Sequence, residues 1–433
     1  MKINGLHHFF TESRKKLLSN FISLSVLQGS NYILPLISVP YLVRVLGPEK
    51  FGLIAFAQAF VAYFGYIIEY GFNFTATKEI SMHRYNKDKV NEIFSLIFYA
   101  KLALTLVAFL LFTFMIILFS KFRSDAMLYY VVFAGLVGNL FFFQWYFQGI
   151  EKMKFITILN VTAKIIFIIF IFIFVRHEQD YVLAALFNSS GFVLAGLISV
   201  YFVSIKFKIR IVPSSIRAIL REISSSFNIF ITQIAPTLYT TSNVFILGLM
   251  TNNTIVGYYS VGEKLVKAVQ AAFNPISQTI FPHVSYLVKT SKMTALKFLR
   301  KVTIISASAT LFFSIVTFFF APQIVTILFG EAFIPAISVV KILAFLPFVG
   351  CLGNIFGAQI MINFNLGHIY AYVVSSAGVF NVILAIILIP YLKQNGIAAS
   401  VISTETIVTI LLFIVLEVMQ LSPRKKNIEE GGE

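Results

Sequence analysis

The chain has 433 residues, of which 58% are hydrophobic and 12% are charged, and its mean hydropathy is +0.87. This apolar share is far above that of a soluble domain and indicates a membrane protein. The formal net charge is +16, and the single cysteine, Cys351, excludes a disulfide or a thiolate metal site within one chain.

The N-terminus predicts a retained first span. Arg14, Lys15 and Lys16 precede an apolar run, as in a signal peptide. The run is too long for the apolar core of a signal peptide, however, and it lacks a small-residue cleavage site.

Twelve apolar runs have the length of a helix that crosses the hydrocarbon core, which takes about 20 residues. We expect these spans near 19–44, 52–77, 92–119, 127–149, 155–175, 181–204, 226–250, 255–286, 302–329, 333–361, 368–390 and 396–420.

Prolines stand inside several of these runs, beginning with Pro35 and Pro40. Proline removes a backbone donor and clashes with the carbonyl four residues back. Bent backbone at membrane depth is tolerated where it lines a cavity or is buried in protein. We therefore expect bends or hinges at Pro35, Pro236, Pro275, Pro282 and Pro347.

Lysine and arginine in the polar breaks predict the orientation. With the N-terminus inside, the cytoplasmic segments carry 23 of these residues and the opposite side carries 6. Basic residues favour the cytoplasmic side, so both termini are expected there. This asymmetry accounts for most of the net charge without a nucleic-acid partner.

The longest break, 205–225, lies at the middle of the chain and is basic. Overlaying Gly52 on Gly257 also aligns the two halves weakly, and internal repeats are common in transporters. The predicted organisation is an N-terminal six-helix lobe at 1–205, a basic cytoplasmic connector at 206–225, and a C-terminal six-helix lobe with a short cytoplasmic tail at 226–433.

Charged residues also fall within the spans: Lys101, Lys164, Lys264, Lys267, Lys341, Glu69, Glu263, Glu405 and Glu417. Such charges face a bundle interior or a wet cavity, or they reach the interface from near a helix end. Both alternatives stay open for Lys101 and Lys341. An interior position is favoured for Lys164, near mid-span, and the interface is favoured for Glu417.

The run 255–286 carries a polar stripe at helical spacings, formed by Ser260, Lys264, Lys267, Asn274 and Gln278. Shorter stripes occur in the runs at 52–77 and 226–250. Hydrogen bonds between helices account for amides and hydroxyls. They do not account for neighbouring lysines, which need an anion or water, so the stripes predict a hydrated, positively charged central cavity.

Motifs for catalysis are missing from the sequence. The segment "GYYSVGEK", residues 257–264, lacks the preceding strand of a phosphate-binding loop, and the histidines show no ligand spacing. We therefore predict a protein that is not an enzyme, holds no metal and has no nucleotide-hydrolysing domain.

Two segments resemble a known family. "LGPEKFGLIAFAQAFVAYFGYIIEYGFNFTATKEIS", residues 46–81, resembles the N-terminal signature of Wzx-type polysaccharide flippases, and "QWYFQGIEKMK", residues 144–154, resembles a second signature. These flippases form the polysaccharide transport branch of the multidrug/oligosaccharidyl-lipid/polysaccharide exporter superfamily. The resemblance implies an all-α integral membrane protein of about 12 helices, in two six-helix lobes that form a V around a central cavity.

The resemblance also implies a function. Such a protein would flip an undecaprenyl-pyrophosphate-linked O-antigen or similar repeat unit from the cytoplasmic to the periplasmic leaflet of the bacterial inner membrane. Its partners would be membrane lipid, a polysaccharide polymerase and a chain-length regulator. For this substrate we expect Lys264, Lys267 and Lys164 to attract the pyrophosphate, with Arg44 at the far mouth. Amides would contact the sugars, with Asn274 and Gln278 as the candidates.

Glu69 occupies the acidic position of "EYGFN" in the first signature. It is either a coupling carboxylate that exchanges H⁺ or Na⁺ during transport, or a structural ion-pair partner of a lysine across the bundle. No other cofactor is expected.

Proteins of other classes remain as alternatives. A multidrug and toxin extrusion exporter would share the architecture, although its cationic substrates favour an acidic cavity. A major facilitator would carry a glycine and arginine motif in the loop after its second span. A polymerase or ligase would need a large periplasmic loop, and a peptidoglycan-precursor flippase usually has more spans.

Overall fold

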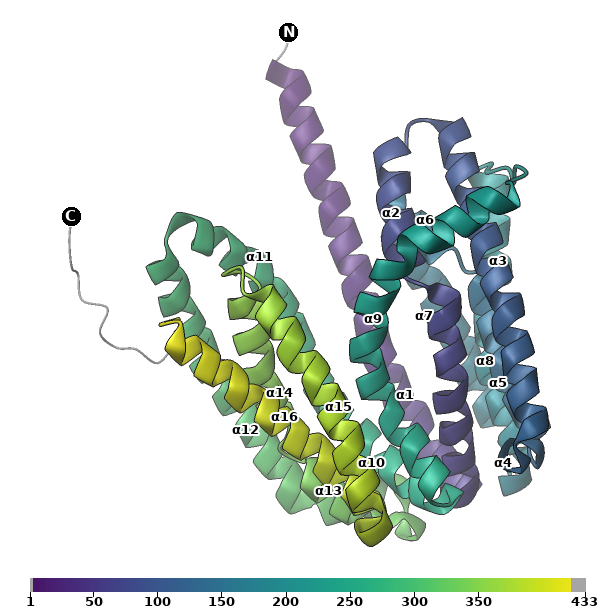
Figure 1. Ribbon diagram of the computed structural model, residues 1–433, viewed down its shortest axis with the longest axis vertical. Coiled ribbons are helices and arrows are strands. Elements are labelled where there is room, and N and C mark those ends of the chain that lie inside the picture. The colour runs from purple at the N-terminus through teal and green to yellow at the C-terminus, as the bar shows by residue number, and fades with distance from the viewer. Residues whose placement is uncertain (1–2, 422–433) are drawn as a thin grey trace. The chain divides into compact units, whose positions relative to one another are not determined.

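The computed structural model describes residues 3–421, with the side chains of 3–19, 21, 24, 32, 232–240, 274 and 275 outside that description. Over this range the chain is built from helices, without strands (Figure 1). It divides into two compact units, Met1–Gly47 with Ala57–Ile234 and Pro48–Phe56 with Ala235–Glu433. The predicted lobes 1–205 and 226–433 and the connector between them remain a prediction.

The helices of the first unit run in chain order to α9, which continues into the second unit. They are α1 (Ile3–Glu69), α2 (Phe72–His83), α3 (Lys87–Leu118), α4 (Ser120–Arg123), α5 (Ala126–Leu140), α6 (Gln144–Gly149), α7 (Met153–Phe174), the short turn η1 (Glu178–Asp180), α8 (Tyr181–Tyr201), the π-helical turn η2 (Phe202–Lys206) and α9 (Ile216–Met250).

The second unit also contains the C-terminal helices. They are α10 (Asn253–Ala271), α11 (Asn274–Thr290), α12 (Lys292–Phe329), the turn η3 (Glu331–Phe333), α13 (Ala336–Leu343), α14 (Leu346–Asn354), the π-helical segment η4 (Ile355–Met361), α15 (Gly367–Leu392) and α16 (Gln394–Val418).

The helices agree with a multi-pass membrane protein. Among the described residues, nine helical segments are long and apolar enough to span a membrane. Each of the twelve predicted runs coincides with helix, but the count of twelve spans stays a prediction.

The helix breaks only partly follow the prolines. Pro275 and Pro347 stand in the first turns of α11 and α14, where a missing backbone donor costs little. In contrast, α1 remains helical through Pro35, and its interruption is at Gly47, with φ 67°. A positive φ favours glycine because it has no Cβ, so the break in the helical backbone of α1 is at Gly47 and not at Pro35.

Small residues bring α5 and α8 of the first unit close together (Figure 1). A Cβ on Gly138 would collide with the backbone of Val193, and one on Gly196 would collide with the carbonyl oxygen of Gly138. Such contacts associate helices where lipid offers no hydrophobic driving force.

The second unit has similar close backbone contacts at Gly52 and Gly257, the two glycines that the weak repeat aligns. A Cβ on Gly52 would collide with the carbonyl oxygen of Asn253, and a Cβ on Gly257 would collide with that of Pro48. The start of α10 therefore packs closely on residues 48–56, which accounts for the grouping of this short segment with the second unit.

The two segments that carry the family resemblance contact each other through α2 and α6. The Thr77 hydroxyl donates to the carbonyl oxygen of Trp145 at 3.2 Å. Arg84, beyond the end of α2, pairs with the Glu151 carboxylate at 2.6 Å, and this hydrogen bond raises the pKa of the guanidinium. Trp145, Tyr146 and Phe147 of the second signature are buried. These contacts give the signatures a structural role.

Candidate functional site

A buried ion pair lies inside the first unit. The Lys101 ammonium on α3 donates to Glu69 Oε1 at 3.0 Å, and the Asn139 amide on α5 donates to the same oxygen at 3.1 Å. Lys101 is 1% exposed. A buried ammonium is costly unless it is paired, so Lys101 belongs to the interior, and the interfacial alternative for it is wrong.

The Glu69 carboxylate lies at a helix break. Glu69 is the last residue of α1, and Tyr70 and Gly71 follow with positive φ before α2 begins. The partial negative charge at a helix C-terminus favours a nearby cation. The second carboxylate oxygen, Oε2, is buried without a hydrogen-bond partner. The structure thus contains the predicted ion pair, and the carboxylate retains one unused acceptor for a proton or a cation.

Lys164 lies half-buried on α7 and donates to the side-chain oxygen of Asn31 on α1. It also lines a small cavity of about 30 Å³ with Asn160 and Asn188. The lysine therefore has a neutral amide partner, and its predicted contact with a pyrophosphate stays a prediction.

Lys264 and Lys267 are exposed on α10 in the second unit. The Lys264 ammonium lies 4.9 Å from the centre of the Phe51 ring, and Lys267 pairs with Glu263 at 2.9 Å. Glu263 is buried and also accepts from the Tyr259 hydroxyl at 3.2 Å. Since one acid stands beside two lysines, this turn keeps a net positive charge.

The predicted polar stripe is not continuous. Helix α10 ends at Ala271 and α11 begins at Asn274, so the chain breaks where the stripe was expected to run straight. Ser260 is buried, unlike Lys264, Lys267 and Gln278. The side chain of Asn274 lies outside the described residues. Proline in the first turn of α11 separates the two parts, which explains why uniform helical spacing was wrong here.

Arg44, predicted at the far mouth, lies exposed on α1. Arg44 belongs to the first unit, whereas Lys264 and Lys267 belong to the second. Its contact with substrate stays a prediction.

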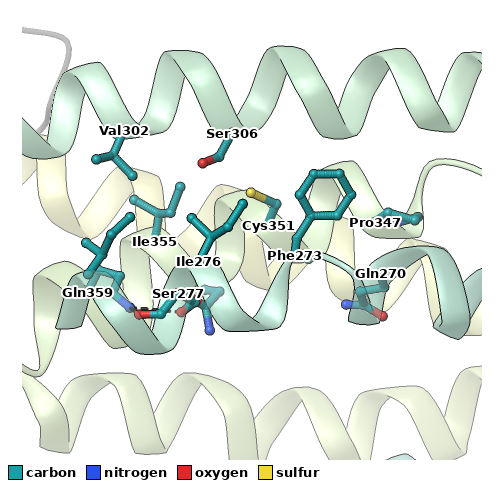
Figure 2. Close-up of a pocket in the computed structure, with 13 residues that line it drawn as sticks. Gln270, Phe273, Ile276, Ser277, Val302, Ser306, Pro347, Cys351, Ile355 and Gln359 are labelled. Carbon is teal, nitrogen blue, oxygen red and sulfur yellow. Dashed lines mark hydrogen bonds between the residues drawn. The ribbon is translucent and has the colours of Figure 1, made fainter. Parts of the chain in front are cut away.

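A cavity of about 110 Å³ with a mostly apolar lining opens among α10, α11, α12, α14 and η4 in the second unit (Figure 2). The amides of Gln270, Asn354 and Gln359 line it together with Ser277 and Ser306. None of these residues belongs to the predicted site.

Sequence reasoning missed these groups for a definite reason. Asn354 and Gln359 are five residues apart, a spacing that no α-helical stripe contains. Asn139 was missed as a partner of Glu69 because it lies on a different helix, 70 residues along the chain. All three residues could have been found from the sequence, because amide side chains are rare in apolar runs.

Comparisons with known proteins identify relatives along most of the chain. A family model described as polysaccharide biosynthesis protein matches residues 17–288. A protein of Escherichia coli (strain K12) named "Putative O-antigen transporter" is 33% identical over 402 residues, which cover 93% of this chain and 97% of that protein. A protein of the same name from Shigella dysenteriae is 25% identical over 396 residues, 91% of this chain and 98% of that one.

Solved structures share the fold. A multidrug resistance MATE family transporter of the MOP superfamily, in an inward-facing conformation, matches with a TM-score of 0.63 and 17% identity, covering 93% of this chain and 98% of its own. The lipid II flippase MurJ, in an inward closed conformation, matches with a TM-score of 0.67 and 11% identity, covering 93% and 89%. At these identities the similarity shows the fold alone.

Proposed function

The chain belongs to the polysaccharide biosynthesis protein family, and from this membership we propose that it flips a lipid-linked oligosaccharide across a membrane. The observation that carries the proposal is the 33% identity, over 93% of this chain, with a relative named as an O-antigen transporter. The substrate class is an undecaprenyl-pyrophosphate-linked repeat unit, moved from the cytoplasmic to the periplasmic leaflet of the bacterial inner membrane. The protein acts as a transporter and not as an enzyme.

The proposed substrate carries a charged pyrophosphate and a hydrophilic glycan, and both must cross the membrane. A pyrophosphate and a hydrophilic glycan cannot enter hydrocarbon without a large desolvation cost. Exposed lysines lower this cost for the pyrophosphate by charge-assisted hydrogen bonds. Lys264 and Lys267 on α10 are exposed and carry more positive charge than Glu263 neutralises. The polyprenyl tail meanwhile stays in lipid.

Ion-gradient coupling by alternating access is part of the proposal, with Glu69 as the coupling group. Its Oε2 is a buried acceptor without a partner, and its Oε1 is held by Lys101 and Asn139. A proton or Na⁺ that enters this cluster changes its charge balance. The orientation with both termini in the cytoplasm, the polymerase and the chain-length regulator belong to the same proposal.

The first test is genetic. Deleting the gene is expected to abolish surface polysaccharide and to accumulate lipid-linked single repeat units, measured by lipid extraction and mass spectrometry. The double variant Lys264→Ala with Lys267→Ala is expected to lower polymer output at least about tenfold, since each lost charge-assisted contact costs about 1.5–3 kcal/mol.

The matched control is the double variant Lys289→Ala with Lys292→Ala. These lysines have the same spacing and are also exposed, but they lie at the turn between α11 and α12. Normal polymer in the deletion strain, together with new drug sensitivity, would contradict the proposal in favour of a small-molecule exporter. Normal polymer in the Lys264 and Lys267 variant would remove the role of these lysines.

A further inference from the structure

The cavity of about 110 Å³ in the second unit has a partly unsatisfied polar wall (Figure 2). The Ser277 hydroxyl donates to Asn354 Oδ1 at 2.5 Å, and Gln359 Nε2 donates to Ser277 Oγ at 2.9 Å. The remaining oxygen of this amide, Gln359 Oε1, is buried without a partner, and Gln359 as a whole is 2% exposed. A buried acceptor without a donor is costly, so this wall is suited to a ligand that donates a hydrogen bond.

The π-helical segment η4 shapes this wall. Residues five apart on an α-helix point about 140° away from each other, since each residue turns about 100°. Where hydrogen bonds run from i to i+5, residues five apart lie one above the other. Ile362 N donates to the carbonyl oxygen of Gly357, five residues earlier, at 3.2 Å. The segment therefore brings Asn354 and Gln359 together toward Ser277.

A second amide, Gln270, lies at the other end of the cavity, and apolar surface separates the two ends (Figure 2). Phe273 and Ile276 supply this surface between Gln270 and Ser277. The break between α10 and α11 lies between Gln270 and Ser277. Gly350 faces Gln270, because a Cβ at Gly350 would collide with Gln270 Nε2.

Amides at both ends and an apolar, aromatic middle match the chemistry of a sugar ring. We propose that this cavity binds one uncharged sugar ring of the transported glycan, an inference that rests on the proposed function. Sugar hydroxyls both donate and accept hydrogen bonds, so one can donate to Gln359 Oε1 while others accept from amide groups. The apolar face of the ring lies against Phe273 and Ile276.

The volume agrees with a ring and not with a single small ligand. One water needs only about 10–15 Å³ on this measure, so a cavity of about 110 Å³ accepts a group of many atoms. The lining residues contain no carboxylate. A cation would therefore find only neutral oxygens in a space larger than it needs, which favours the sugar.

The position of the cavity along α10 links it to the lysines. Lys267 and Gln270 are three residues apart, a spacing that puts neighbours on one face of a helix. Lys264 and Lys267 therefore precede the cavity by about 5–9 Å along the axis. The sugar nearest the pyrophosphate is attached directly to it, so the lysines hold the phosphates while the cavity receives the first sugar.

Cys351 allows a direct test, because it lines this cavity and is the only cysteine of the chain. The purified protein in lipid nanodiscs is treated with N-ethylmaleimide, and the rate of Cys351 alkylation is followed by intact-protein mass spectrometry. The probes are the lipid-linked oligosaccharide extracted from the deletion strain and undecaprenyl pyrophosphate without sugar, and native mass spectrometry measures their binding separately.

We expect saturating glycolipid to slow alkylation at least about fivefold and sugar-free undecaprenyl pyrophosphate to leave the rate unchanged. Glycolipid that binds without slowing alkylation would overturn the sugar site and leave the proposed function standing. Glycolipid that does not bind would remove the proposed function and the sugar site together. A thiol that never reacts, or one protected by sodium chloride and not by glycolipid, would also overturn the inference.

Three variants, two on α14 and one on η4, sharpen the test. Gly350→Ala places a methyl group against the Gln270 amide and is expected to remove most of the protection. Gly353→Ala is the matched control on the same helix, because its Cβ meets Thr409 and Gly353 does not line the cavity. Gln359→Leu, which removes the unpartnered acceptor, is expected to weaken protection like Gly350→Ala. Full protection in both cavity variants would contradict the site.

Discussion

At the scale of single residues, the geometry of the buried pair of Glu69 and Lys101 is compatible with both roles that the sequence left as alternatives. Lys101 needs an anion because it is 1% exposed, and Glu69 supplies it at 3.0 Å. The same carboxylate retains a buried oxygen without a partner. A structural pair and a coupling group are therefore compatible, and a charge-balanced variant can separate them.

Glu69→Gln removes the carboxylate and leaves the Lys101 ammonium buried without an anion. Breaking a buried pair costs about 3 kcal/mol or more, so we expect this variant to be less stable and inactive. Combining it with Lys101→Met removes the unpaired charge and is expected to restore most of the stability, measured by thermal unfolding in detergent.

Transport by the double variant then decides the role of Glu69. With the coupling role, the double variant folds but its transport no longer follows the ion gradient. Lys341→Met, which removes another lysine inside a span, serves as the control and is expected to keep the normal gradient dependence. If the double variant regained transport with that dependence, Glu69 would be a structural partner only.

At the scale of helices, close backbone contact carries much of the packing. Gly52 and Gly257 each face a backbone carbonyl across the contact between residues 48–56 and α10. Lipid is as apolar as a leucine side chain, so helices associate through close packing and not through hydrophobic burial alone. A larger side chain at such a contact pushes the two backbones apart, because a backbone, unlike a side chain, cannot move away by changing its rotamer.

Gly52→Ala and Gly257→Ala are each expected to destabilise the protein by about 1–3 kcal/mol, the usual cost of overpacking. A lower midpoint of thermal unfolding in detergent measures the effect. Gly29→Ala is the control, because nothing lies within 4 Å of a Cβ there. Equal midpoints for Gly52→Ala and Gly29→Ala would show that the contact on α10 does not limit stability.

Hydropathy predicted where the helices lie but not where they break. A run of about 20 apolar residues is required by the thickness of the bilayer, so each predicted run coincides with helix. The interruptions after Glu69 and Ala271 depend on positive φ angles and on proline in a first turn. Apolar composition contains no information on either, which is why the stripe through Ser260 and Gln278 was extended too far.

Across the whole chain, the sequence predicts which residues are candidates for function better than it predicts which side chains those residues contact. Lys264, Lys267 and Glu69 could be identified as candidate functional residues because charges inside a membrane span are rare and costly. Their partners depend on helix rotation, so Lys101 and Asn139 could not be assigned to Glu69 in advance. The predicted division at 206–225 also did not anticipate that residues 48–56 group with the second unit, since that depends on a contact across more than 200 residues.

Movement of a lipid-linked glycan between leaflets by this protein can be measured after reconstitution. Purified protein and extracted lipid-linked oligosaccharide are placed in liposomes, and an impermeant glycan-cleaving enzyme is added outside. Without protein, only the glycan of the outer leaflet is cleaved. We predict that the protein makes nearly all of it accessible and that the Lys264→Ala, Lys267→Ala double variant leaves the inner fraction protected. An inner fraction that stays protected with the unaltered protein, under an imposed proton or sodium gradient, would contradict flipping of the glycan by this protein.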